Sequence, residues 1–272
     1  MVQKNIFIDK YKEIPYFACP HCNTGRLEFL KSDIIEKESG LNQNLRDNSS
    51  WEFDEFLMKF ILIANCQNRD CGENAVISGE KFPERNYKPS FDSEDGEERF
   101  KNGINYINEN YYKIKYIFPA PFIITIPIEI YDLYKDRACG PKCEIVENLI
   151  KSFELFWIDE HSCANKMRII IELIMDYEGI PKESKNKKGE NYRLSLGDRI
   201  NRYKENNEEQ SERLLAIKWI GNDGSHSSCK LHKEELLEVY EILESILEKV
   251  FSKKEERINK KVSEINKNKG IS

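Results

Sequence analysis

Apolar residues recur at helical spacing through the second half of the chain, which predicts a series of amphipathic helices. One stripe runs from Val146 to Trp157, a second from Met167 to Ile174, and a third from Leu236 to Val250. Gly179-Ile180-Pro181 is expected to end the second helix. Two more helices are predicted, one opened by a capping box that begins at Ser195 and one over Glu208–Ile220.

The first half has a different texture, in which short runs of aromatic and β-branched residues alternate with residues that break regular structure. The predicted strands are Tyr16–Cys19, Arg26–Lys31, Phe56–Cys66, Asn74–Glu80 and Tyr111–Phe118. Gly40–Ser50 and Pro83–Gly103 are predicted to be loops. The pattern as a whole predicts an α+β protein, in which a β-rich domain (1–130) precedes an all-helical domain (131–252) of about five helices and a basic tail (253–272).

Two cysteine pairs lie at the turns that connect the predicted strands. Cys19 and Cys22 form a C-x2-C pair, and Cys66 and Cys71 form a C-x4-C pair. Zn²⁺ takes four thiolates in a tetrahedron, and each tight turn between strands can deliver two of them. Gly72 and Asn23 each follow a pair, at a turn position that often needs a positive φ. The sequence therefore predicts a structural zinc ribbon with these four ligands.

The cysteine spacings allow other interpretations. A redox C-x2-C is disfavoured because no βαβ context surrounds it, and His21 is expected to point away from the metal. A second metal site formed by Cys139, Cys143, His161 and Cys163 is an alternative to ordinary helix and turn cysteines, which are favoured. A disulfide scaffold is disfavoured because the sequence has no secretory signal.

Charge and length restrict the classes of function. The 272 residues carry a net charge of −6, which argues against binding nucleic acid through one wholly basic face. The segment from Lys253 to Lys269 is nevertheless mostly basic. No apolar run approaches the roughly 18 residues that a membrane span needs, so a cytoplasmic location without a membrane partner is expected.

A candidate site for RNA or phosphate lies near the end of the predicted fourth helix. Lys218, Asn222 and His226 stand at i, i+4 and i+8, so a continuing helix would place an ammonium, an amide and an imidazole on one face. Gly221 and Gly224 make that continuation costly, and a tight turn would also present Asn222 and His226. The alternative is a purely structural role, in which Asn222 and His226 cap the helix through hydrogen bonds.

At this point the chain resembles the bacterial domain-of-unknown-function family 4145, a branch of the HEPN superfamily. The resemblance covers about residues 120–252, with a less specific likeness in the ribbon at 14–80. The matching stretches are Ile126–Ile130, Lys166-Met167-Arg168 through Glu172, Leu196–Ile200, and Ile220-Gly221-Asn222 followed by His226.

The resemblance implies a HEPN-like helical domain that often forms a homodimer and is associated with bacterial defence, toxin or restriction systems. Catalytic HEPN members are metal-independent endoribonucleases with an Arg five residues before the His. This chain has Gly221 in that place, which puts cleavage in doubt, and Lys218 or Arg168 would have to supply the missing charge. We therefore expect an RNA-directed component; the alternative is a non-enzymatic adaptor that dimerises and docks a partner protein.

Overall fold

The computed structural model describes residues 6–7, 10–22, 24–52, 56–94, 97–136, 140–205, 207–223, 231–252 and 254–268. The chain divides into two compact units, with the division between Pro121 and Phe122. Each unit is described by itself. Among the described residues, no helix combines the length and apolar character that crossing a membrane requires.

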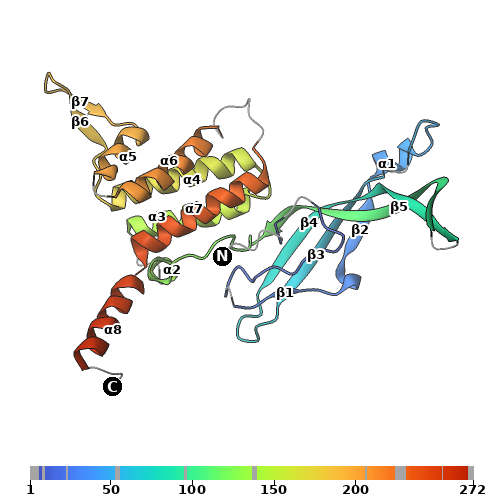
Figure 1. The fold of residues 1–272 in the computed structure, drawn as a ribbon, viewed down its shortest axis with the longest axis horizontal. Helices are drawn as coiled ribbons and strands as arrows, with labels where there is room; N and C mark the ends of the chain where they lie inside the picture. The colour runs from blue at the N-terminus through green and yellow to red at the C-terminus, as the bar shows by residue number, and fades with distance from the viewer. Residues whose placement is uncertain are drawn as a thin grey trace. The chain divides into compact units, whose positions relative to one another are not determined.

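An antiparallel sheet organises the N-terminal unit (Figure 1). Its path runs β1-β3-β4-β5, and β2 also pairs with β3. The strands are β1 (Leu27–Glu28), β2 (Ile35–Glu38), β3 (Met58–Cys66), β4 (Asn74–Glu94) and β5 (Glu97–Phe118). A 3₁₀ helix, η2, spans Lys31–Asp33 and precedes β2.

Strand β3 shows how the sequence pattern produces the core of this unit. Phe60, Leu62 and Ala64 are buried, whereas Ile61 and Ile63 between them are 45% and 55% exposed. Successive side chains of a strand point to opposite faces, so one face of β3 is buried. Each fully buried large apolar side chain contributes about 1.5–3 kcal/mol relative to an exposed one.

Two predicted loops of this unit are regular structure instead. Residues Gly40–Leu45 form the short helix α1, whose N-cap Ser39 accepts a hydrogen bond from the Asn42 N–H. Most of the predicted loop Pro83–Gly103 lies in the long hairpin of β4 and β5, where Pro83 is aligned with Asn110. The polar composition suggested loops, but pairing with an adjacent strand satisfies the backbone groups whatever the side chains are.

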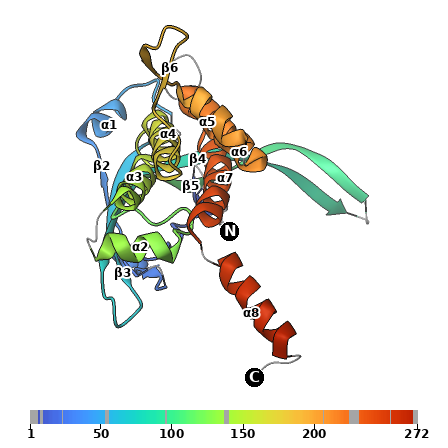
Figure 2. The same cartoon turned by 90° about the vertical axis from the view of Figure 1, so that its left-hand side faces the viewer.

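Helices form most of the C-terminal unit, together with a small antiparallel hairpin. The helices are α2 (Ile128–Lys135), α3 (Pro141–Leu155), α4 (Glu160–Tyr177), α5 (Leu196–Lys204), α6 (Glu208–Asp223), α7 (Lys233–Phe251) and α8 (Lys254–Asn268). The hairpin consists of β6 (Glu183–Lys185) and β7 (Asn191–Arg193) and connects α4 to α5. Helix α4 packs against α3 and α6, and α6 packs against α5 and α7 (Figure 2).

The fold-class prediction of a small β zinc ribbon followed by an all-α HEPN-like bundle of about five helices is therefore wrong. Helices α2 and α8 and the β6–β7 hairpin go beyond the five predicted helices. Helix α2 begins immediately after Pro127, in a stretch for which no helix was predicted. The hairpin lies in the lysine-rich stretch Pro181–Asn191 and the residues just after it.

Local signals placed several helix ends correctly. Ser195 accepts a hydrogen bond from the Asp198 N–H, and the Asp198 carboxylate accepts one from the Ser195 N–H, which completes the predicted capping box. Gly179, with φ of +73°, follows α4 as the predicted stop. The stripes on α3, α4 and α7 form the core, where Leu149, Ile171 and Leu243 are fully buried.

Candidate functional site

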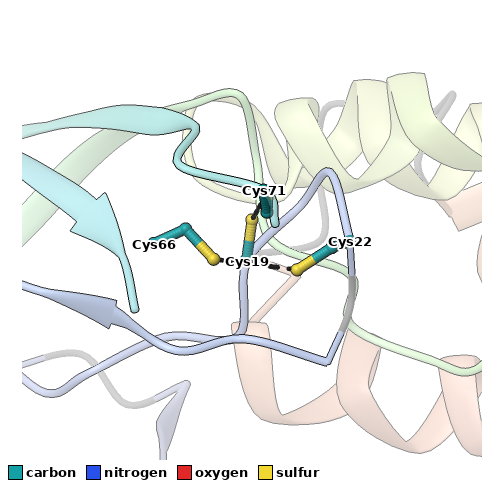
Figure 3. Close-up of side chains that lie close together, drawn as sticks. All are labelled: Cys19, Cys22, Cys66 and Cys71. Atoms are coloured by element: carbon teal, nitrogen blue, oxygen red, sulfur yellow. Dashed lines mark hydrogen bonds between the residues drawn. The ribbon is translucent and has the colours of Figure 1, made fainter. Parts of the chain in front are cut away.

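The two cysteine turns converge on one point in the N-terminal unit. Cys19 and Cys22 lie in the turn before β1, Cys66 ends β3, and Cys71 lies in the turn before β4. The Sγ atoms of Cys19 and Cys71 are 3.8 Å apart, and those of Cys22 and Cys66 are 3.7 Å apart. All four Sγ atoms lie within 4.8 Å of one another. Figure 3 shows the four thiols directed toward a common centre.

These separations fit a metal ion bound by four thiolates. A tetrahedron with metal–sulfur bonds of about 2.3 Å has sulfur–sulfur edges of about 3.8 Å. A disulfide would instead need about 2.05 Å, and all four cysteines are free thiols. The cluster is the only group of this kind found among the residues that the structure describes.

Backbone hydrogen bonds hold both turns in the shape that the cluster requires. The Cys19 N–H donates to the Gly25 carbonyl at 2.8 Å, and the Gly25 N–H points back to the Cys22 Sγ at 3.2 Å. In the second turn, the Cys71 N–H donates to the Asn68 carbonyl at 2.9 Å. Gly72 has the predicted positive φ, at +64°, whereas Asn23 lies outside the described residues.

The thiols of the cluster differ in acidity. Hydrogen bonds from the Thr24 side chain and the Gly25 N–H lower the pKa of Cys22 to about 5. Burial, assisted by the neighbouring thiols, raises the pKa of Cys66 to about 12. His21 is exposed, and its Nδ1 lies 3.5 Å from the Cys71 Sγ. A bound cation would favour the thiolate form of all four ligands.

Gly25 is a residue of the site that the sequence did not reveal. A Cβ atom added to it would lie 2.3 Å from the Cys66 Sγ and 2.9 Å from the Asn68 Cβ. Only a glycine therefore allows the first turn to approach the second this closely. The close approach joins residues that are 41 or more positions apart in the chain, so local turn signals cannot show it.

We predict that Gly25→Ala lowers the bound metal per chain and destabilises the N-terminal unit. The added methyl group has to displace the Cys66 Sγ or the backbone beside it, and such overpacking costs about 1–3 kcal/mol. Metal analysis and thermal unfolding measure the two effects. Gly40→Ala is the matched control, since a Cβ there meets no described atom within 4 Å. Equal metal content in both variants would contradict the assignment.

The remaining cysteines do not form a second cluster among the described residues. Cys163 is fully buried, and its Sγ lies 3.3 Å from the Tyr240 hydroxyl, which donates to the Ser152 Oγ. Burial raises the pKa of the Cys163 thiol to about 12, which keeps it protonated. Cys143 is buried beside the Leu133 carbonyl. Cys139 and Cys229 lie outside the described residues.

The structure brings three of the four candidate RNA-site residues onto adjoining helices of the C-terminal unit. Arg168 lies on α4, and Lys218 and Asn222 lie on α6, which packs against α4. His226 lies outside the described residues. The Lys218 Nζ lies 3.7 Å from the centroid of the exposed Trp219 ring.

Gly221 lies where α4 and α6 approach each other closely. A Cβ atom added to it would lie 2.8 Å from the Arg168 Cβ, 3.3 Å from the Ala164 carbonyl oxygen and 3.5 Å from the Arg168 Cδ. The aliphatic part of the Arg168 side chain thus packs over the backbone of Gly221, which has no side chain. The predicted pair between Arg168 and Glu172 is loose, with 3.6 Å between Nε and Oε1.

Comparison with known protein families supports the predicted resemblance to domain-of-unknown-function family 4145. Residues 151–268 match the family model described as Domain of unknown function (DUF4145), and residues 8–103 match Domain of unknown function (DUF8608). No curated protein and no solved structure matches the chain. The first match spans α4 to α8 and the end of α3, including Arg168, Lys218 and Asn222. Residues 151–268 are therefore similar to this family.

Proposed function

We propose that this chain is a zinc-stabilised RNA-binding component of a bacterial defence, toxin or restriction system. Two observations support the proposal: the four-thiol cluster of the N-terminal unit and the juxtaposition of Arg168 with Gly221 in the DUF4145 domain. The biological setting rests on the resemblance of that domain to the HEPN superfamily. The metal acts as a structural element, and the helical unit contacts the RNA.

Zinc is the metal that best suits the cluster. Soft thiolate ligands in a tetrahedron select zinc or iron, and four thiolates are typical of structural zinc sites. Catalytic zinc keeps one position open for water or substrate, whereas here four protein sulfurs supply a complete tetrahedron. The role that follows is a zinc ribbon that joins the turn before β1 to the turn before β4.

The approach of Arg168 to Gly221 carries the RNA-binding proposal. The resemblance to HEPN ribonucleases implies that those enzymes carry an arginine at the position that corresponds to Gly221. Here the Cβ and Cδ atoms of Arg168 lie over that glycine, so α4 brings an arginine to the place where α6 has none. A guanidinium binds phosphate through two parallel hydrogen bonds, which no glycine can do.

Lys218 adds a second positive charge to the same face. It lies one turn before Asn222 on α6, and a Cβ added to Gly197 at the start of α5 would lie 3.6 Å from its Nζ. Its charge adds to the hydrogen bonds from Ser195 in lowering the pKa of the nearby Asp198 carboxyl. Phosphate groups supply most of the affinity of proteins for nucleic acids, so two cations beside an amide suit RNA binding.

Fluorescence anisotropy with a labelled single-stranded RNA tests this function. We expect saturable binding by the full chain at low salt, and about a tenfold loss of affinity for Arg168→Gln, the usual effect of losing a charge-assisted hydrogen bond. Lys218→Gln should also flatten the dependence of affinity on salt, because one phosphate contact is lost. Lys151→Gln, which removes an exposed cation paired with Glu154 on α3, is the control.

Absence of saturable binding at low salt would overturn the RNA-binding function, and so would an equal loss for Lys151→Gln. Cleavage is a separate question that the same RNA answers. If cleavage occurs without added metal and both His226→Ala and Arg168→Gln abolish it, the protein is a metal-independent endoribonuclease that uses Arg168 in place of the motif arginine. If the RNA is bound but stays intact, the chain binds RNA without cleaving it.

A non-enzymatic adaptor is the second candidate function, favoured by exposed apolar side chains on the sheet. Ile61 and Ile63 of β3 and Tyr116 and Phe118 of β5 are between 36% and 55% exposed. Exposed apolar patches of this kind mark protein interfaces. An adaptor would present this face to a second copy of the chain or to a partner subunit, and a chain that is dimeric but binds no RNA would favour it.

A further inference from the structure

A charged cavity lies in the C-terminal unit between α4, the start of α5 and the β6–β7 hairpin. Figure 1 shows these elements adjoining one another. The cavity has a volume of about 470 Å³, within the range of about 300–1,000 Å³ that is usual for small-ligand sites. The charged residues that line it are Arg168, Glu172, Asp176, Lys182, Arg193 and Arg199.

One part of this charge is an ion-paired cluster of two cations around one carboxylate. Arg199 is 5% exposed and donates to the Asp176 carboxylate at 2.7 Å and to the Ile180 carbonyl at 2.8 Å. Lys182 forms a second ion pair with Asp176 at 2.8 Å. Burial of Asp176 favours its neutral form, but the hydrogen bonds from Lys182 and Arg199 hold its pKa below the usual value. One carboxylate therefore stays ionised between two cations.

The other part leaves positive charge and N–H groups unmatched. Arg168 approaches Glu172 only at 3.6 Å, and the Arg168 Nε is buried without a hydrogen-bond partner among the described residues. The Nε of the buried Arg199 also lacks a partner within the described chain. Arg193 is exposed and forms no ion pair with any residue that the structure describes. Four cations thus face two carboxylates, an excess of two positive charges.

We propose that this cavity binds a terminal phosphate group, carried either by the end of an RNA or by a free nucleotide. A phosphate monoester carries a charge of about −1.5 to −2 near pH 7, which matches the excess of two cations. Its three oxygens accept the parallel N–H donors that guanidinium groups present. A carboxylate would neutralise only one of the two charges. The RNA alternative rests on the function proposed above, whereas the nucleotide alternative does not.

Isothermal titration calorimetry of the full chain at low salt tests the site, first with inorganic phosphate and then with AMP. Arg193→Gln is the informative variant, because its exposed side chain can be replaced without disturbing the core, whereas Arg199 has several partners in the fold. We expect saturable binding that Arg193→Gln weakens about tenfold. Lys204→Gln, at the other end of α5 and paired with Glu208, should leave the affinity unchanged.

A second arm identifies the source of the phosphate. A short RNA is compared with and without a 5′ phosphate, and tighter binding of the phosphorylated RNA that depends on Arg193 assigns the cavity to an RNA end. Equal binding of the two RNAs together with Arg193-dependent binding of AMP assigns it to a free nucleotide.

Two results would overturn the proposal. The first is the absence of saturable binding of phosphate, AMP and phosphorylated RNA alike. The second is binding that Arg193→Gln does not weaken more than Lys204→Gln does. Phosphate and AMP contain no RNA, so the two proposals are tested independently. The phosphate site can be refuted while RNA binding through Arg168 and Lys218 is confirmed, and RNA binding can be refuted while the phosphate site is confirmed.

Discussion

Replacing Cys66 by serine should abolish stoichiometric zinc binding and unfold the N-terminal unit while the C-terminal unit keeps its helices. Serine offers a neutral hydroxyl in place of a thiolate, and the other three cysteines cannot complete the tetrahedron. The apparent free energy of binding a structural zinc is about 10–16 kcal/mol in small zinc domains at neutral pH, and it is also folding free energy. Mass spectrometry of metals gives the zinc content, and limited proteolysis shows which unit is lost.

Cys143→Ser is the matched control, because Cys143 is also a buried free thiol but lies in α3, apart from the cluster. It should retain one zinc per chain and a protease-resistant N-terminal unit. A chelator added to the unaltered protein should reproduce the effect of Cys66→Ser. Freshly prepared, reduced protein that contains no metal would refute the zinc site, and iron in place of zinc would refute the identity of the ion.

The cysteine cluster was predictable because its signal is local. Two turns, each carrying two cysteines between strand-like segments, indicate where the chain must reverse and what it can bind. Gly25 was not predictable, since its role depends on contact with Cys66 across the sheet. The same limit applies to β2 and to the long β4–β5 hairpin, whose polar residues are paired with a strand that sequence patterns do not identify.

In the C-terminal unit, apolar periodicity located the helices that bury one face. It missed α8, whose sequence is mostly charged, with exposed Ile258 and Val262 among the few apolar positions. It also could not show that Gly221 allows Arg168 to reach over α6, because that contact joins two helices. The residues of the phosphate cavity were missed for the same reason: Arg193 and Lys182 read as ordinary surface charges until the hairpin places them opposite Arg168.

Leu243→Glu should prevent cooperative folding of the C-terminal unit rather than separate a dimer. The α7 stripe could have formed a dimer seam, in which case this substitution would give folded monomers. The structure instead places Leu243, Tyr240 and Leu247 at 0% exposure within the chain. A carboxylate at this position would be buried without a hydrogen-bond or ion-pair partner. Such a change lowers the free energy of unfolding by more than about 4 kcal/mol.

A loss of that size is a large part of the roughly 5–15 kcal/mol by which natural domains are stable. We expect the variant to lose its cooperative thermal transition by circular dichroism and to aggregate on purification. Leu243→Met is the control, because a swap that nearly conserves volume in a core costs less than about 1.5 kcal/mol. A folded Leu243→Glu monomer with an unchanged melting temperature would contradict this expectation. It would mean that the apolar stripe of α7 is the interface with a second copy of the chain.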